Sequence, residues 1–248
     1  MYFKTRAQLT AVDQEFIASS LGATEEEQSA ILRLTGDPDS VTDLLHDRRL
    51  FQRSMTVPPA FLSVSPHLFF YVFVYQALEQ KHIADDDVVD YVAGVCVEFR
   101  SAESFWSLSS SGDKTIYAVD LINLLGEVDK HQQYHLRRFI GNASLFLTGF
   151  FPDFIFQRSK QKGAPPIQYY EAIGRRQYES AATDSLSYEA NAAPVLGTLA
   201  ERFVEIRSAI NVYTDAHLNL MNPKRSLDRL ERQAATLDED TFRQSLEL

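Results

Sequence analysis

Residues 68–78 read Leu-Phe-Phe-Tyr-Val-Phe-Val-Tyr-Gln-Ala-Leu, and ten of these eleven residues are apolar. Pro66 precedes the stretch, and the polar residues 79–82 (Glu-Gln-Lys-His) follow it. A helix that is apolar on all sides belongs in the interior of a protein, because none of its faces is suited to water. We therefore expect a central helix from about 67 to 81, around which the rest of the chain packs.

A second apolar run covers residues 139–156, in which eleven of eighteen residues are apolar. The first run is too short to cross roughly 30 Å of hydrocarbon. The second is interrupted by Asn142 and by Pro152-Asp153, and a charged residue inside a bilayer is costly. We therefore expect no membrane span, and both runs should lie at the centre of the protein.

The composition, 45% hydrophobic and 12% aromatic over 248 residues, is sufficient for one substantial core or two small ones. A disordered chain is excluded, and the single cysteine, Cys96, excludes an internal disulfide. The 34 acidic residues exceed the 24 basic ones, so the formal net charge is −10. Nucleic acid is not an expected partner, since binding to phosphates depends on surplus Lys and Arg. The N-terminus has no signal-peptide pattern, so we expect a cytoplasmic protein.

Helix-start signals are clear in the N-terminal part of the chain. A hydroxyl residue followed three positions later by an acidic residue has the spacing of a capping box, which occurs at Thr10 with Asp13 and at Thr24 with Glu27. Asp37-Pro38 combines an N-cap with a proline in the first turn. Gly22 and Gly36 stand where a left-handed residue is expected to end a helix.

Helical spacing and breaking residues divide the remaining chain. They predict helices over about 86–99, 167–182 and 194–221. Residues 116–161 should also be helical, in two or three pieces separated near Asp129 and Pro152, and residues 101–114 should form a serine-rich loop. The predicted fold is all-α, a single bundle of roughly eight to ten helices. Residues 1–55 form an N-terminal layer or a small subdomain, 56–221 the main aromatic-rich bundle, and 222–248 a packing or docking helix.

The predicted last helix has a narrow apolar seam. Its members recur at spacings of three, four and three residues: Leu227, Leu230, Ala234 and Leu237. A seam this narrow packs on one neighbouring helix, in the same chain or in a partner. We therefore expect a protein partner or self-association through 222–248.

Asp86, Asp87 and Asp90 are the first candidate metal ligands. Their spacing resembles the aspartate-rich motif of isoprenoid synthases, and the resemblance implies Mg²⁺ ions that hold a diphosphate, because hard cations prefer carboxylate oxygens. Acidic residues at a helix start also stabilise the helix dipole, so these residues equally fit a helix N-terminus.

Histidines supply the other candidate metal ligands. His131 and His135 are four residues apart, which places both rings on one helical face. The pair could bind zinc or iron there, or the two residues are simply polar residues at a helix end. Glu79 and His82 have the Glu-x-x-His spacing of helical di-iron proteins, but only once. His46-Asp47 resembles the metal-binding dipeptide of HD-domain phosphohydrolases, and we expect His46 on a solvated helix face.

Two arginine pairs are candidates for an anionic ligand. Arg137, Arg138, Arg175, Arg176 and the nearby Tyr178 supply guanidinium groups and a hydroxyl for such a ligand, or they pair with the abundant Asp and Glu. The aromatic side chains of the two apolar runs line an apolar ligand pocket or simply pack the core.

The sequence contains no complete catalytic constellation, neither a glycine-rich phosphate loop nor a nucleophile elbow. We therefore expect a non-catalytic cytoplasmic helical interaction or regulatory protein, with no cofactor predicted. The alternatives are a metal-dependent helical enzyme, which would hold a divalent metal at Asp86, Asp87 and Asp90 or at the histidine pair, and an apolar-ligand carrier.

Overall fold

The protein is described by a computed structural model that covers residues 4–56, 64–83, 85–99 and 118–218. Within these residues every regular element is helical, which confirms the all-α prediction. The described residues contain thirteen α-helices, more than expected, because the predicted helix 194–221 is broken in two and the short helix Ser185–Glu189 was not predicted. The predicted loop 101–114 and the predicted helix 222–248 lie outside the described residues.

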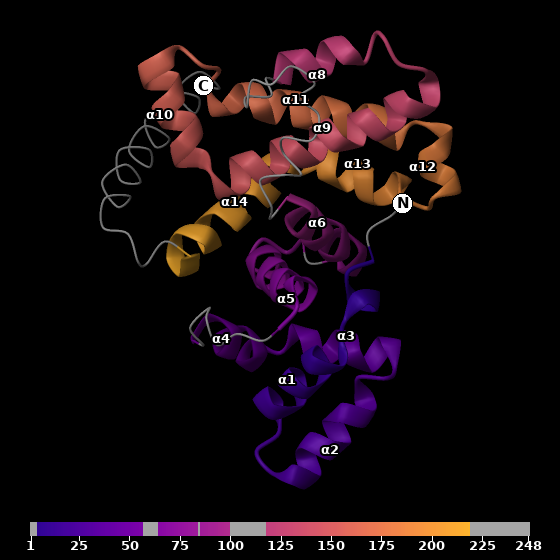
Figure 1. The fold of residues 1–248 in the computed structure, drawn as a ribbon, viewed down its shortest axis with the longest axis vertical. Coiled ribbons are helices and arrows are strands. Elements are labelled where there is room, and N and C mark those ends of the chain that lie inside the picture. The colour runs from indigo at the N-terminus through magenta and orange to yellow at the C-terminus, as the bar shows by residue number, and fades with distance from the viewer. Residues whose placement is uncertain (1–3, 57–63, 84, 100–117, 219–248) are drawn as a thin grey trace, which may run out of the picture.

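The helices keep the numbering of Figure 1. They are α1 (Ala11–Leu21), α2 (Glu25–Leu34), α3 (Pro38–His46), α4 (Arg48–Thr56), α5 (Pro66–Glu79), α6 (Asp86–Phe99), α8 (Ala118–Leu124), α9 (Lys130–Phe150), α10 (Pro152–Lys162), α11 (Ile167–Ala182), α12 (Ser185–Glu189), α13 (Ala193–Glu201) and α14 (Phe203–Tyr213). A 3-10 turn, Arg6–Gln8, precedes α1, and a π-helical turn, Thr214–Leu218, follows α14.

Helix α5 is central, as its sequence predicted. It contacts α3 and α4 on one side and α6 and α14 on the other (Figure 1). Its side chains Leu68, Tyr71 and Phe73 are fully buried. The helix begins at Pro66, where the Ser65 hydroxyl accepts from the Leu68 N–H at 3.2 Å. A single cluster of buried apolar side chains runs from α1 through α5 to α14, so the N-terminal layer, α1–α4, shares the core of the bundle.

Local capping signals predicted the helix starts correctly. Both capping boxes form, and Asp37 caps α3 through the Ser40 N–H. The expectation that Gly22 and Gly36 are left-handed was wrong, because the one described glycine with positive φ is Gly163. Gly22 has φ −95°, and a Cβ there would lie 2.8 Å from a backbone nitrogen of α2, so close approach rather than handedness requires glycine.

The expected single helix over 194–221 was also wrong, because it breaks at Arg202 between α13 and α14. Arg202 has φ −104° and ψ 22°, outside helical geometry. Its guanidinium donates to the carbonyls of Lys81 and His82, at 3.3 and 3.4 Å, just beyond the end of α5. The break therefore places a side chain where it ties α13–α14 to the end of the central helix.

The second apolar run is only partly central. Helix α9 ends at Phe150, and α10 leaves it at an angle of 88°. Phe146 is buried, but the bend leaves Phe151 and Phe154 exposed by 43% and 52%. In the part of the chain that the structure describes, no single helix has the length and hydropathy of a membrane span, and α9 and α10 meet the criteria only when taken together.

Candidate functional site

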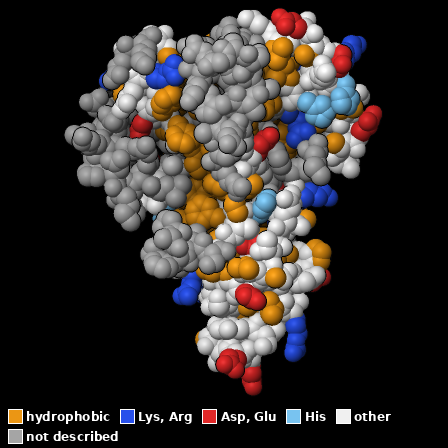
Figure 2. All heavy atoms as spheres, in the orientation of Figure 1, with side chains coloured by type: hydrophobic (Ala, Val, Ile, Leu, Met, Phe, Trp, Pro, Cys, Tyr) orange, Lys and Arg blue, Asp and Glu red, His pale blue; other side chains and the backbone are white. Residues whose placement is uncertain are grey.

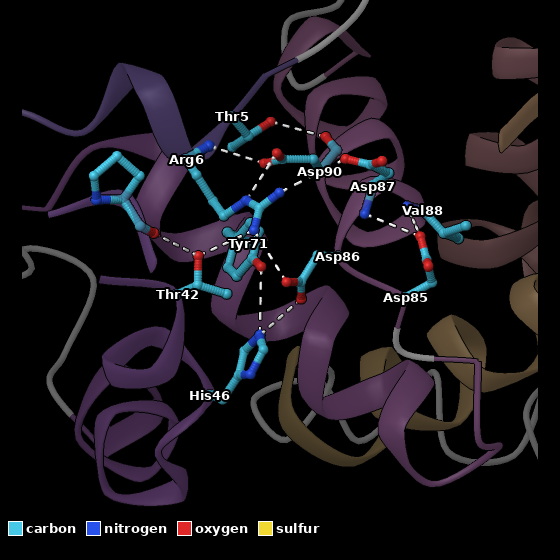
Figure 3. A network of polar contacts seen from close by, with 11 residues as sticks. Thr5, Arg6, Thr42, His46, Tyr71, Asp85, Asp86, Asp87, Val88 and Asp90 are labelled. Carbon is cyan, nitrogen blue, oxygen red and sulfur yellow. Dashed lines mark hydrogen bonds and ion pairs between the residues drawn. The ribbon is translucent and has the colours of Figure 1, made fainter. Parts of the chain in front are cut away.

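A network of polar contacts joins the N-terminal layer to α5 and α6 (Figure 3). We call it the Arg6 cluster, and its members are Thr5, Arg6, Thr42, His46, Tyr71, Asp86, Asp87 and Asp90. Its members come from four segments: the 3-10 turn Arg6–Gln8 with the preceding Thr5, helix α3, helix α5 and the start of α6. Because these segments are far apart in sequence, the cluster forms only when the N-terminal layer is packed on the bundle.

Arg6 and Asp90 form the centre of the Arg6 cluster. The Arg6 backbone N–H and its Nε each donate to the Asp90 carboxylate, both at 2.9 Å. The neighbouring Thr5 hydroxyl donates to the Asp90 carbonyl, also at 2.9 Å. The Asp90 side chain is only 5% exposed, and its burial raises the pKa of Asp90 although the hydrogen bonds from Arg6 act in the opposite direction. The buried carboxylate is thus held by the guanidinium and the backbone N–H of Arg6, while the Thr5 hydroxyl bonds the backbone carbonyl of the same residue.

The other end of the Arg6 side chain reaches the remaining aspartates. Its Nη1 lies 3.0 Å from the Thr42 hydroxyl and 3.1 Å from Asp86, and its Nη2 lies 3.7 Å from Asp87. The three carboxylates that the sequence proposed as metal ligands therefore surround a cation that belongs to the chain itself. Among the described residues, no group of three or more His, Cys, Asp or Glu side chains is arranged to hold a metal ion.

His46 faces this cluster, so the expectation of a solvated helix face was wrong. Its ring stacks on Tyr75 with centroids 3.7 Å apart, and its Nε2 lies 3.1 Å from Asp86 and 3.5 Å from the Tyr71 hydroxyl. The cause is the packing of α3 on α5. Burial lowers the pKa of His46, against the opposing charges of Asp86 and Asp43, so the neutral ring is favoured.

A second polar cluster lies between α6, α9 and α11. The hydroxyls of Tyr91 and Tyr178 both donate to Oδ1 of Asn142, at 3.0 and 2.9 Å, and Arg138 Nε donates to the Tyr91 hydroxyl at 3.3 Å. All four side chains are buried. The Asn142 amide also bonds the Glu98 carboxylate. These polar groups satisfy one another, which fixes the three helices relative to one another.

The five residues predicted to bind an anion do not form one site. Arg138 and Tyr178 belong to this second cluster, where the protein's own groups are their partners. Arg137 instead donates to the Gln177 side chain at 3.1 Å. Arg175 and Arg176 are exposed on α11.

The predicted histidine pair is adjacent, as the helical spacing required. The rings of His131 and His135 have centroids 4.8 Å apart, and both side chains are exposed on α9. Burial and the neighbouring His131 lower the pKa of His135. Within the described residues they belong to no larger group of metal-ligating side chains.

Sequence reasoning missed the surface at the start of α10. We call it the α10 corner and define it by Phe151, Phe154, Phe156, Arg158 and Lys160. The Arg158 guanidinium lies 5.3 Å from the centre of the Phe154 ring, and the Lys160 Nζ lies 4.3 Å from that of Phe156. Basic and hydrophobic side chains lie together where Figure 1 places α10 (Figure 2). The sequence contained one signal for this surface, because Phe154 and Phe156 are each followed four residues later by a basic residue. Both phenylalanines belong to the apolar run 139–156, which was assigned to the core as a whole.

Two pockets lie on the surface of the described residues. One of about 470 Å³ is lined by Ala182, Thr183, Tyr188, Asn191, Ala193 and Pro194, and another of about 430 Å³ by Glu79, His82, Ile83, Asp85, Thr198 and Arg202. The second contains the Glu-x-x-His pair of the sequence, with the Arg202 guanidinium beside it. No family model, curated protein or solved structure matches the chain, so the assignment of a role depends on this geometry alone.

Proposed function

We propose that this chain is a non-catalytic helical interaction protein of the cytoplasm, which binds its partner through the α10 corner. The observation that carries the proposal is the exposure of Phe151 and Phe154, by 43% and 52%, beside the cationic side chains of α10. Exposed aromatic rings next to arginine are typical of the anchors of binding surfaces, because burying the rings removes apolar area from water.

The polar clusters support a structural rather than a chemical role for the interior. Arg6 neutralises the buried Asp90, and the Asn142 carbonyl oxygen accepts from two tyrosine hydroxyls. Groups engaged in this way connect helices, and their removal would leave buried polar atoms without partners. The same side chains would have to be released before they could serve a substrate.

Site-specific photo-crosslinking in cells tests the proposal. A photoreactive phenylalanine analogue replaces Phe154 in one variant and Tyr188 in the other; Tyr188 is 64% exposed on α12 and is the matched control. We expect a crosslinked partner, protein or lipid, at 154 and none at 188. No product at 154, or equal products at both positions, would overturn the proposal.

A further inference from the structure

We infer that the α10 corner binds the surface of an anionic phospholipid bilayer without crossing it. The inference rests on the proposed function, because it names the class of partner for the same surface. The sequence predicted no membrane span and no membrane partner; contact with a bilayer surface needs no span and revises only the second expectation.

The bend between α9 and α10 sets the geometry. Helix α10 leaves α9 at 88°, directly after Phe151, whose N–H still bonds the Leu147 carbonyl at 2.9 Å. Ile155 of α10 is 3% exposed, and α10 contacts α9 and α11, so one side of the helix packs on the bundle. A short helix fixed at such a corner can lie along a membrane surface, with its side chains reaching the boundary between headgroups and acyl chains.

The apolar part of the contact comes from the phenylalanines. Phe154 projects with half of its surface exposed, and Phe151, at the bend itself, is exposed by 43%. Large apolar side chains on one side of an interfacial helix insert by about 5–10 Å into a bilayer surface. Because α10 is packed on α9 and α11, these rings are presented without any rearrangement of the core.

The basic side chains of α10 favour a bilayer with anionic headgroups. From 152 to 160 the sequence has two basic residues, Arg158 and Lys160, and one acidic residue, Asp153, in a chain whose net charge is −10. Anionic headgroups attract such a cluster but repel the remainder of an acidic protein, so the cluster would also orient it. Arg158 lies over Phe154 on one flank of α10, and Lys160 lies over Phe156 on the opposite flank, so a cation stands beside a ring on each side of the face that points away from the buried Ile155. Long basic side chains reach headgroup phosphates while the adjacent rings enter the apolar layer.

Vesicle sedimentation with the full chain tests this inference. The probes are vesicles of equal parts phosphatidylglycerol and phosphatidylcholine, compared with vesicles of phosphatidylcholine alone. We expect binding to the anionic vesicles to be at least about tenfold stronger and to weaken as salt is raised, because salt screens surface charges.

Two variants remove the proposed contacts, and two are matched controls. Phe151→Ser with Phe154→Ser removes the rings, and Arg158→Glu with Lys160→Glu reverses the charge. Arg175→Glu with Arg176→Glu changes an equal charge on exposed residues of α11, and Tyr188→Ser removes an exposed ring of α12. We expect the first two variants to lose about tenfold or more in vesicle binding and both controls to bind like the wild type. Circular dichroism of each variant confirms that the helices are retained.

The outcomes separate this inference from the proposed function. Equal binding to both kinds of vesicle, or an equal loss in the α11 control, would overturn the lipid inference. If vesicles fail to bind while the crosslink at 154 captures an acidic protein, the lipid inference falls and the proposed function stands. If neither vesicles nor a crosslinked partner are found, both fall.

Discussion

Asp90 is a buried carboxylate that depends on an arginine 84 residues earlier in the chain. Removing one member of a buried ion pair leaves the other charge buried and unpaired. The resulting loss of folding free energy is larger than the net stabilisation that the pair contributes. Arg6 donates both from its backbone and from its side chain, so only the side-chain part is lost on substitution. The Arg6 cluster is therefore the place where single substitutions should report most strongly on the attachment of the N-terminal layer.

Arg6→Ala should lower the free energy of unfolding by about 3 kcal/mol, because Asp90 would keep its burial and lose its guanidinium. Urea denaturation followed by circular dichroism measures the change. Adding Asp90→Asn should recover part of the loss, since an amide has no charge to leave unpaired.

Arg49→Ala is the control for this experiment. Arg49 pairs with Asp47, but its side chain is 64% exposed, so solvent screens the pair. Its loss should cost much less free energy of unfolding than the loss of Arg6. Equal costs for Arg6→Ala and Arg49→Ala would show that the Arg6 cluster contributes no more than a surface ion pair.

The titration of His46 should make the stability of the protein depend on pH. Burial lowers the pKa of His46 in the folded protein below its ordinary value of 6.5, so the folded state binds this proton less readily than the unfolded state. The stability that the neutral ring contributes is therefore present above pH 6.5 and is lost as the pH falls through the folded pKa. His46→Gln cannot titrate, so its melting temperature should fall less than that of the wild type between about pH 7.5 and pH 5.5.

The matched control is His82→Gln, which changes an exposed histidine just beyond the end of α5. Its melting temperature should follow the wild type over the same pH interval. A wild-type pH dependence that survives in His46→Gln would place the responsible group elsewhere.

Helix starts were predictable from sequence because their signals are local. Thr10, Asp13 and Asp37 act on amide groups three residues away, and proline marks the start of α5. The break at Arg202 was not predictable, because it depends on carbonyls about 120 residues away in sequence. The Arg6 cluster was missed for the same reason. Its aspartates were noticed, but nothing in the spacing of one segment indicates which distant cation will neutralise them.

Close packing of α11 on its neighbours predicts a contrast between two helical glycines. A Cβ at Gly174 would lie 2.5 Å from the Phe203 ring and 3.0 Å from Ser144, whereas a Cβ at Gly197 meets nothing within 4 Å. Gly174→Ala should therefore destabilise the protein by about 1–3 kcal/mol through overpacking. Gly197→Ala should stabilise it by up to about 1 kcal/mol, because alanine is the better helix former.

Urea midpoints of the two glycine variants measure this contrast. A Gly174→Ala variant as stable as Gly197→Ala would mean that α11 has room to move away from Phe203. Both variants add the same methyl group to a helix, so helix propensity is matched and the difference isolates the packing.

The seam at Leu227, Leu230, Ala234 and Leu237 remains a prediction, since residues 222–248 lie outside the described part of the chain. Deleting them should lower the number of copies per particle, obtained from the mass measured by light scattering, because a narrow apolar seam is suited to one partner helix. An unchanged number of copies together with unchanged partner capture would remove the support for docking through this helix.

At the scale of the whole molecule, composition and periodicity were sufficient to predict the fold class, but they did not predict which apolar residues are exposed at the surface. The central position of 68–78 followed from its uniform apolarity, and the buried residues of α5 confirm it. The run 139–156 carried the same signal, yet its last part is exposed at the α10 corner. Average apolarity does not indicate where a chain turns, and the 88° bend decides which phenylalanines face water.

The continuous core predicts that the N-terminal layer and the bundle unfold together. Leu45 of α3 is fully buried in the same cluster of apolar side chains as Cys96 of α6, which is 1% exposed. Leu45→Ala should lower stability by about 2–5 kcal/mol through loss of buried area and the cavity it leaves. Labelling of the Cys96 thiol in urea reports on α6, and circular dichroism reports on all helices. If the core is one cooperative unit, the substitution moves both transitions to lower urea by the same amount. A separate subdomain would give a different result: part of the helical signal would be lost early, while Cys96 would stay protected to the wild-type urea concentration.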